Sequence, residues 1–340
     1  MARATIKDIA LAAKVSPMTV SNVINGRRAK ASDETVERIK AAIETLGYTP
    51  NLSARSLVSK ASRMVGVLIP FTEDQNQLLL NNPFYAEIVS GIESALREAG
   101  YYMMLSGVRA DGGRLETLQS WNMDALIVLG VYKERLYEEL KAHDLPTLLI
   151  DSYIDDPHFY RLGVDDEAAA YRATRYLIEK GHRGVALVTG VIRTDGVIER
   201  RVAGYRRTLE EAGIAFDPAR ILSGSVTFDW GVAAAEQLAA LPETTAAFCT
   251  ADLIAAGLLA GLHRLGKRIP EDYSVMGFDN LPISRMVYPA LTTVDQSILG
   301  KGQLAGKLIT DILGKNDPPR ESLIDFAIVE RDSVAIRSRS

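Results

Sequence analysis

Cysteine and histidine are scarce in this chain of 340 residues. The single cysteine, Cys249, excludes an intramolecular disulfide and a cysteine-based zinc site, and the four scattered histidines show no metal-ligand spacing. Long apolar runs are also missing, since no segment approaches the roughly 20 apolar residues of a membrane helix. The N-terminus, MARATIKDIA, lacks the apolar core of a signal peptide. We therefore expect a cytoplasmic protein with no metal site and no membrane partner.

Motifs that carry catalysis are absent as well. The sequence contains no GxSxG, no GxxxxGK[ST] and no HExxH, and no glycine-rich phosphate-binding fingerprint opens a helix. Carboxylates are plentiful, but none form a pair with a spacing typical of acid–base catalysis. The sequence therefore predicts no catalytic residues and no cofactor, and we expect the protein not to be an enzyme.

Charge is distributed unevenly along the chain. Residues 1–60 contain ten Lys and Arg against five Asp and Glu, a net charge of +5, whereas the whole chain carries −4, which leaves −9 for the remainder. A hydrophobic content of 47% with 24% charged residues is typical of a globular protein, and the length suits two or three domains. A basic head on an acidic body indicates that the head binds a polyanion.

Residues 1–60 predict three short helices. Thr5 precedes apolar residues at helical spacing, and Asp8 stands three residues later, a variant of the capping box. Ser16 can cap a second helix that has Pro17 at its first position. Ser32 can cap a third helix, whose expected inner stripe is Val36, Ile39, Ile43 and Leu46.

Two short helices joined by a tight turn and supported by a third form a helix-turn-helix, whose second helix enters the major groove of DNA. A small helical bundle that only packs on the body is the alternative. The basic balance of the segment and the polar outer face of its second helix favour DNA binding.

The stretch TIKDIALAAKVSPMTVSNVINGRR, continued by SDETVERIKAAIETLGYTPNLSARSL, resembles the head of the lactose-repressor (LacI) family of transcriptional regulators. Family members often have Arg or another long donor at the position of Asn22. Here we expect the Asn22 amide to pair with adenine, while Pro17 and Met18 offer apolar contact with thymine methyl groups. The resemblance implies the following DNA-binding residues in the head: Thr5, Ser16, Pro17, Met18, Thr19, Ser21, Asn22 and Asn25.

Residues 51–62 follow a helix-breaking Tyr-Thr-Pro and contain the short helical stretch LSARSLVSK. Such a piece is too short to be stable alone in water, and its residues by themselves fit a flexible linker. The resemblance implies instead a hinge helix that folds when two copies pack together on DNA. Its leucine would wedge into a base step from the minor groove, and separating the two hinges would release the DNA. The implied contact residues are Asn51, Ala54, Arg55 and Leu57.

From residue 63 onward, short apolar strands such as VGVLIP and ALIVLG alternate with amphipathic helical stretches. This alternation predicts parallel sheets covered by helices on both faces, and two such series predict two doubly wound lobes. The body also resembles the sensor domain of the same family, which is similar to periplasmic sugar-binding proteins. Ligands of such folds bind at the carboxyl ends of the strands, so we expect the site between the lobes.

The expected fold is thus an all-α helix-turn-helix head and an α/β body of two doubly wound parallel-sheet lobes, like a periplasmic binding protein. We expect a DNA-binding domain at 1–50, a hinge at 51–62 and a dimerising effector-binding domain at 63–340. Within the body, the N-lobe is expected at about 63–162 and 294–323, and the C-lobe at about 163–293 and 324–340.

Candidate effector-binding residues follow from the resemblance one position at a time. Arg201, just before VAGY, matches an arginine that donates to ligand hydroxyls or a carboxylate, and Asp279 in GFDN matches an acid that accepts from sugar hydroxyls. The family's Asn-Asp motif reads Ala251-Asp252 here, so one ligand amide is missing. The candidates are Phe84, Tyr85, Arg201, Trp230, Asp252 and Asp279.

The polar candidates also have structural interpretations. Arg201 could form a surface ion pair with Glu199, and Asp279 could cap the segment that follows it. Asp165, in GVDD near the expected lobe crossover, is expected to be structural.

The aromatic candidates likewise have more than one interpretation. Phe84 and Tyr85 could belong to the core rather than to the edge of the cleft. Phe228 and Trp230 compete for the position of a stacking aromatic, with Trp230 slightly favoured. The segment FTEDQNQLLLNN is longer than expected between the first strand and first helix of the body, and could reshape the mouth of the pocket.

The expected partners are double-stranded DNA with a palindromic operator, a small sugar-like effector and a second copy of the chain. The C-terminus carries no heptad tail, so a homodimer is favoured over a tetramer. Whether the effector is an inducer or a corepressor stays open. A free sugar-binding protein would explain the body alone, but not residues 1–60.

Overall fold

Two units with separate hydrophobic cores make up the chain: a head, Met1–Ser62, and a body, Arg63–Ser340. The computed structural model describes residues 4–24, 31–48, 62–71, 78–109 and 122–337. Among these residues, none of the helices combines the length and the apolarity that crossing a bilayer requires.

The described part of the head contains the helices α1 (Ile6–Ala13), α2 (Pro17–Ile24) and α3 (Asp33–Thr45). Thr5 Oγ1 accepts a hydrogen bond from Asp8 N at 3.4 Å, while the Asp8 carboxylate accepts from Thr5 N at 2.8 Å, so the expected capping box is present. Ser16 Oγ accepts from Thr19 N at 3.1 Å, and Ser32 caps α3. These caps satisfy backbone donors that the first turn of a helix leaves unpaired.

Side chains from all three helices fill the core of the head, which consists of Ile9, Ala10, Ala13, Val20, Ile39 and Ala42. Leu46 differs from its prediction, because it is 40% exposed rather than part of the inner stripe. Since α3 ends at Thr45, Leu46 is already the cap residue, and the buried position of the preceding turn belongs to Ala42.

The body contains two six-stranded sheets, one in each lobe. The N-lobe consists of β1 (Met64–Phe71), η2 (Leu79–Asn81), α5 (Pro83–Glu98), β2 (Tyr102–Arg109), β3 (Ala125–Leu129), α7 (Arg135–Lys141), β4 (Thr147–Ile150), β5 (Tyr160–Val164), α13 (Ile298–Leu313) and β11 (Glu321–Ile324). The C-lobe consists of α8 (Asp166–Glu179), β6 (Val185–Thr189), α9 (Val197–Glu211), η3 (Pro218–Arg220), β7 (Ile221–Ser223), α10 (Phe228–Ala240), β8 (Ala246–Cys249), α11 (Asp252–Arg264), β9 (Ser274–Asp279), α12 (Ile283–Met286), β10 (Thr292–Asp295) and β12 (Ala327–Val329).

The strand order is β11-β5-β4-β3-β1-β2 in the N-lobe and β12-β10-β9-β8-β6-β7 in the C-lobe. All neighbouring pairs in these two sheets are parallel except β10 with β12. The chain crosses between lobes after Val164, after Asp295 and after Ile324. The expected boundaries at 162, 293 and 323 therefore fall one or two residues too early, inside β5, β10 and β11.

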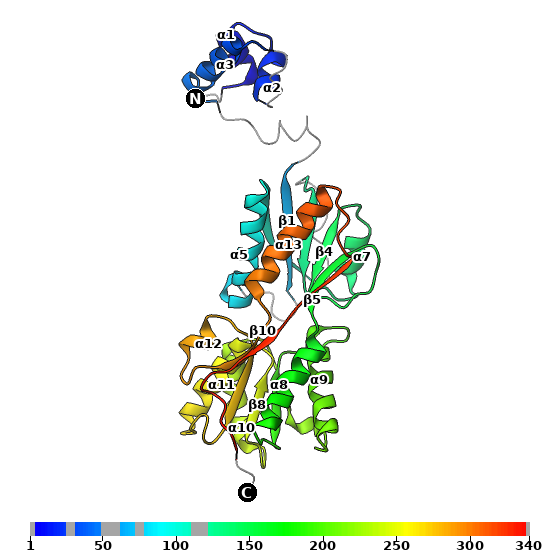
Figure 1. Cartoon of the computed structure of the whole chain (residues 1–340), viewed down its shortest axis with the longest axis vertical. Helices are drawn as coiled ribbons and strands as arrows, with labels where there is room; N and C mark the ends of the chain where they lie inside the picture. The colour runs from blue at the N-terminus through cyan, green and yellow to red at the C-terminus, as the bar shows by residue number, and fades with distance from the viewer. Residues whose placement is uncertain (1–3, 25–30, 49–61, 72–77, 110–121, 338–340) are drawn as a thin grey trace. The chain divides into compact units, whose positions relative to one another are not determined.

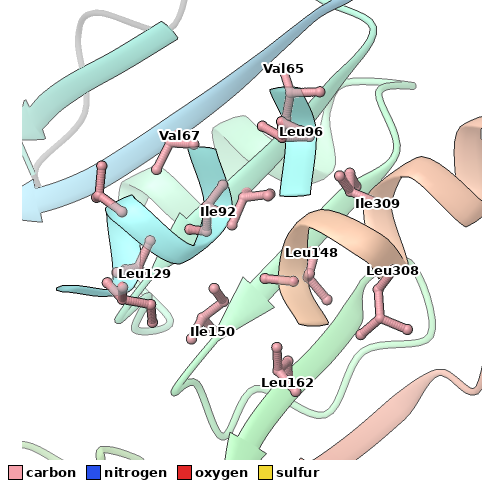
Figure 2. Packing of buried hydrophobic residues seen from close by; sticks show 14 of the residues in the cluster. Val65, Val67, Ile92, Leu96, Leu129, Leu148, Ile150, Leu162, Leu308 and Ile309 are labelled. Carbon is pink, nitrogen blue, oxygen red and sulfur yellow. The ribbon is translucent and has the colours of Figure 1, made fainter. Parts of the chain in front are cut away.

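Helices cover both faces of each sheet. In the N-lobe, α5 and α13 lie side by side on one face, and α7 covers the other (Figure 1). Figure 2 shows the core between the helix pair and the sheet, where Ile92 of α5 lies near Val67 of β1 and Leu308 of α13 lies near Leu148 of β4. Burying such side chains contributes about 1.5–3 kcal/mol each.

Close approach of α5 and α13 depends on glycine. A Cβ atom on Gly91 would meet the backbone oxygen of Leu299, and one on Gly302 would meet that of Ile88. The two helices therefore pack backbone to backbone. Because α13 directly follows the second crossover, this packing fixes the segment that leads from the C-lobe into the N-lobe.

Candidate functional site

The exposed face of α2 is the candidate nucleic-acid interface of the head. Ser16, Pro17 and Met18 are exposed, Met18 to 70%, whereas Val20 is fully buried in the core. The remaining expected contacts in this helix, Thr19, Ser21 and Asn22, are partly exposed.

The other expected DNA-contact residues lie outside α2. Thr5 is exposed and caps α1. Asn25 and the hinge residues Asn51, Ala54, Arg55 and Leu57 lie outside the described residues.

A pocket opens in the body where strands of both sheets end. Leu129 at the end of β3 and Asp151 just after β4 line it from the N-lobe, and Thr250 just after β8 and Asp279 at the end of β9 line it from the C-lobe. The carboxyl ends of parallel strands are the usual ligand position in such sheets. Four of the six predicted effector-binding residues line this pocket: Phe84, Tyr85, Arg201 and Asp279.

Arg201 is held rigidly in the wall of the pocket. Its side chain is buried, Nε donates to Asp166 Oδ1 at 2.8 Å, Nη2 forms an ion pair with the same oxygen at 2.7 Å, and Nη1 donates to the Thr250 carbonyl at 2.6 Å. The guanidinium carbon lies 3.7 Å from the centre of the Phe278 ring. The ion pair is therefore with Asp166 rather than with Glu199, which instead accepts from the Asp195 backbone N–H.

The Asp166 carboxylate, just after the first crossover, is itself positioned by a side chain of the N-lobe. Tyr153, on the segment between β4 and β5, donates from its hydroxyl to Asp166 Oδ2 at 2.8 Å. Asp165, next to it, caps α8 by accepting from Ala168 N at 2.9 Å, as its structural interpretation expects.

Asp279 closes a polar chain that links the two lobes. Gln296, on the second crossover, donates from Nε2 to Asp279 Oδ1 at 2.6 Å, and its Oε1 accepts from Lys301 Nζ at 2.6 Å. The fully buried Lys301 also donates to Asp151 Oδ1 at 2.8 Å. Burial raises the pKa of Asp279 to about 7, although the nearby Arg201 charge and the Gln296 hydrogen bond oppose the shift.

Phe84 and Tyr85 stand at the N-terminus of α5, on the N-lobe side. Their rings meet edge to face with centroids 5.6 Å apart, and both are half-buried. Asn82 caps the helix by accepting from Phe84 N at 3.0 Å. The cap places both rings at the pocket, while both also pack against the N-lobe core, so the two interpretations of these residues apply together.

Asp252 and Trp230 are not among the described residues that line the pocket. Asp252 is fully buried and accepts from Thr293 Oγ1 at 2.6 Å and from Leu281 N at 2.8 Å, so it joins α11 to β10 and to the segment after β9. Burial raises its pKa well above the usual range.

The indole of Trp230 donates to the Thr189 carbonyl at 3.1 Å, and its ring packs directly over Gly224. Phe228, the competing aromatic, is 37% exposed and does not line the pocket either. Trp230 therefore serves packing in the described structure.

An ion pair and an aromatic contact join the lobes beside the pocket. Arg193, after β6, donates to Glu134 Oε1 at 3.2 Å, and its guanidinium carbon lies 5.3 Å from the Tyr132 ring centre. Tyr132 and Arg193 both line the pocket. A Cβ atom on Gly196 would collide with the Tyr132 ring, so glycine lets the two loops approach closely.

Sequence reasoning missed the polar residues that hold the site together. Asp151 has a visible signal, because a carboxylate directly follows the apolar strand TLLI, where ligand-binding groups of parallel sheets stand. Lys301 and Gln296 carry no such signal, since they look like ordinary surface residues of a helix and its preceding turn.

Comparison with known proteins finds one family model that matches the head and another that matches part of the body. The family model described as "Bacterial regulatory proteins, lacI family" matches residues 5–51, and a model of a periplasmic binding protein-like domain matches residues 174–334. The ribose operon repressor of Haemophilus influenzae is 33% identical over 338 residues, which cover 97% of this chain and 98% of that protein.

Solved structures agree with this result. The complex of the transcriptional regulator CelR with cellobiose is 30% identical, with a TM-score of 0.71, over 97% of this chain and 100% of that chain. The lac repressor dimer bound to operator and an anti-inducer has a TM-score of 0.84 at 24% identity, over 98% of this chain and 100% of that chain, and this likeness shows the fold.

Proposed function

Because the chain belongs to the lacI family of bacterial regulatory proteins, we propose that it represses transcription as a homodimer whose paired heads bind a palindromic operator. The chain is a DNA-binding transcriptional regulator, and its relatives named above are regulators rather than enzymes. It works in the cytoplasm, where the chromosome lies. Residues 1–50 bind DNA, residues 51–62 form the hinge, and residues 63–340 bind the effector and dimerise.

The head reads DNA with the exposed face of α2. Ser16 and Thr19, at the start of the helix, stand where a recognition helix contacts phosphates, and Asn22 lies one turn further along the helix. The Asn22 amide has the donor and acceptor needed for the N6/N7 edge of adenine, while Met18 supplies apolar surface for a thymine methyl group.

The effector is a sugar or a sugar derivative that binds in the pocket between the lobes. The observation that carries this proposal is the pairing of Arg201 and Asp279 in one pocket lined by both lobes. A guanidinium and a carboxyl side by side can donate to and accept from neighbouring hydroxyl groups. The ribose operon repressor and the cellobiose complex of CelR provide supporting parallels among its relatives.

Effector binding changes DNA affinity through the angle between the lobes. The pocket is bounded by both sheets, so an occupant favours the lobe arrangement that contacts it from both sides. The N-lobe leads into the hinge at residues 51–62, and a change in the spacing of two hinges in a dimer alters their fit to the operator. A coupling free energy of about 1–3 kcal/mol is enough for a 5- to 150-fold change in affinity.

The test separates the two activities in the full-length chain. Operator sequences are first selected from random duplexes, and affinity is then measured by fluorescence anisotropy across a salt series. We expect a palindromic consensus, a steep decrease of affinity with salt, and a dimer by sedimentation. Asn22→Ala should reduce operator affinity while sugar binding persists, and Asp279→Asn should abolish the response to sugar while operator binding persists. Selection that yields no consensus, with no binding at low salt, would refute the proposed function.

A further inference from the structure

A fully buried lysine connects the pocket to the second crossover between the lobes. We propose that Lys301 is a positioning residue that holds the pocket carboxylates of the two lobes in one arrangement, and thereby sets the lobe angle and the operator affinity of the regulator. This inference rests on the proposed function and concerns the regulation of the same pocket. Lys301 is not among the described residues that line the pocket, so it acts through Asp151, Gln296 and Asp279.

Burial makes the Lys301 ammonium group depend on two partners. The side chain is 0% exposed, and Nζ donates to Asp151 Oδ1 at 2.8 Å and to Gln296 Oε1 at 2.6 Å. A buried cation that loses its partner strongly destabilises the fold, so both contacts are kept together. Asp151 stands just after β4 in the pocket wall, whereas Gln296 stands just after β10 on the crossover. One side chain therefore joins the N-lobe wall of the pocket to the segment that enters the N-lobe.

The chemistry of Lys301 also fixes the direction of the next hydrogen bond. An ammonium group has donors only, so the side-chain amide of Gln296 must turn its oxygen toward Lys301. Its Nε2 then faces Asp279 Oδ1 and donates to it at 2.6 Å. Burial raises the pKa of Asp279 to about 7, so near neutral pH this carboxyl group can accept or donate and does not select the amide orientation alone. Lys301 therefore determines which end of the amide Asp279 meets.

Backbone strain lies at residues that this chain of hydrogen bonds holds. Three residues on or beside it have positive φ angles, 51° at Asp151, 122° at Asp279 and 48° at Ser297. Residues with a side chain rarely adopt such angles. Strained conformations persist where surrounding contacts fix them, and they cluster at switch regions. The bonds of Lys301 to Asp151 and of Gln296 to Asp279 are contacts of this kind, so their loss would let the backbone at both pocket carboxylates relax.

The place of Lys301 on α13 carries this arrangement into the N-lobe. Lys301 lies in the first turn of the helix, where its backbone N–H donates to the Ser297 carbonyl at 2.7 Å. The next residue, Gly302, packs against the backbone of Ile88 on α5, and the two helices lie side by side (Figure 1). The first turn of α5 lines the pocket. The helix pair therefore moves as one unit when the lobe angle changes, and the bonds of Lys301 favour one angle.

Spin-label distances on the full-length protein measure the lobe angle. Labels are attached at Glu138→Cys on α7 of the N-lobe and Gln237→Cys on α10 of the C-lobe, both exposed positions. The native Cys249 is 0% exposed and burial raises the pKa of its thiol, so it does not react with the label. Labelled chains are refolded from urea with an excess of unlabelled chains, so that each distance is measured within one chain.

Two lysines of α13 provide a matched pair of variants. Lys301→Met removes both buried contacts, whereas Lys307→Met removes an ion pair with Asp311 whose lysine side chain is 69% exposed. We expect Lys301→Met to shift or broaden the interlobe distance by several ångströms, and to change operator affinity without added effector by about fivefold or more. Lys307→Met should leave the distance and the operator affinity unchanged.

The double variant Asp151→Asn/Lys301→Met separates positioning from simple stabilisation. The neutral pair leaves no carboxylate without its cation, so thermal melting should recover part of the loss, and this variant serves the test if Lys301→Met alone does not fold. The interlobe distance and the operator affinity should nevertheless stay altered, because Gln296 still lacks the donor that anchors its amide. A lysine that only stabilised the fold would let all three measurements recover together.

The outcomes distinguish this inference from the proposed function. A wild-type distance in the double variant, an equal change in Lys307→Met, or an altered distance with unchanged operator affinity would overturn the inference. The distance measurement needs neither operator nor effector. If the wild-type protein bound no operator while the distances changed as expected, the positioning role of Lys301 would stand and the proposed function would have failed.

Discussion

Neutralising Asp279 should change how the stability of the body depends on pH. Asp279 is 6% exposed as a residue, and burial raises the pKa of its carboxyl group to about 7, against about 3.9 in an unfolded chain. Between these two values the folded protein binds the proton and the unfolded chain does not. The wild-type protein should therefore lose stability as pH rises from about 4 to about 7, and remain level above that.

The size of the effect follows from the pKa difference. Each pH unit inside the window corresponds to about 1.4 kcal/mol, so this one group destabilises the folded state by about 3 kcal/mol between pH 5 and pH 8. Asp279→Asn removes the titrating group but keeps an oxygen that can accept from Gln296 Nε2. Relative to wild type, the variant should therefore gain about 3 kcal/mol over the same range of pH.

Urea unfolding at pH 5, 6, 7 and 8 tests this prediction. Both tryptophans of the sequence lie within residues 63–340, so fluorescence follows the body alone. Asp272→Asn is the control, because that carboxylate is held by Arg268 and its pKa is lowered to about 2, so it does not titrate in this range. A constant stability difference between Asp279→Asn and wild type from pH 5 to pH 8 would refute the reasoning.

Three further predictions concern other parts of the molecule. Asn22→Ala should weaken operator binding by about 1–3 kcal/mol and relax the preference for one base pair in the selected consensus, with unchanged melting of the body. Lys301→Met should destabilise the body by up to about 3–5 kcal/mol in urea unfolding, because it removes the buried cation and leaves the partly buried Asp151 without its ion-pair partner, and adding Asp151→Asn should restore part of the loss. Equal losses in the single and double variants would contradict the pairing. Glu134→Gln should speed effector dissociation up to about fivefold in stopped-flow measurements, because the partly exposed ion pair of Glu134 with Arg193 is worth at most about 1 kcal/mol. If this variant changed operator affinity in the absence of effector, a role confined to the pocket mouth would be contradicted.

Local signals in the sequence predict the fold well because each acts over a few residues. Thr5, Ser16 and Ser32 stand before apolar periodic segments, and each caps a helix in the structure. The apolar runs of the body become buried strands. A strand that helices cover on both faces carries apolar side chains at every position, so a short continuous apolar run is a local signal of such a strand. Leu46 departs from its pattern because the helix ends one residue before it, and helix ends are the least determined part of such a prediction.

The candidate site is predicted less completely because its geometry depends on residues far apart in the sequence. Arg201 and Asp279 are found from their motifs, but the partners that orient them, Asp166 and Gln296, are 35 and 17 residues away. Asp252 shows the opposite case, in which the sequence suggests a ligand-binding residue that the structure uses for internal hydrogen bonds. An acid at the first position of a helix after a strand looks like a ligand-binding group, yet here both its oxygens are engaged by Thr293 and the backbone of the segment after β9.

Two carboxylates of the pocket, Asp151 and Asp279, are connected through the second crossover between the lobes. Gln296 lies on the second crossover and connects Asp279 of the C-lobe to Lys301, which in turn binds Asp151 of the N-lobe. A ligand head that binds Asp151 and Asp279 would therefore bridge the same two lobes as this internal chain. Any change in the lobe angle must lengthen or break one of these short buried hydrogen bonds, each worth about 1.5–3 kcal/mol when a charged group takes part. The ligand and the crossover thus act on one common set of carboxylates, which is why occupancy of a small pocket can select one arrangement of two large lobes.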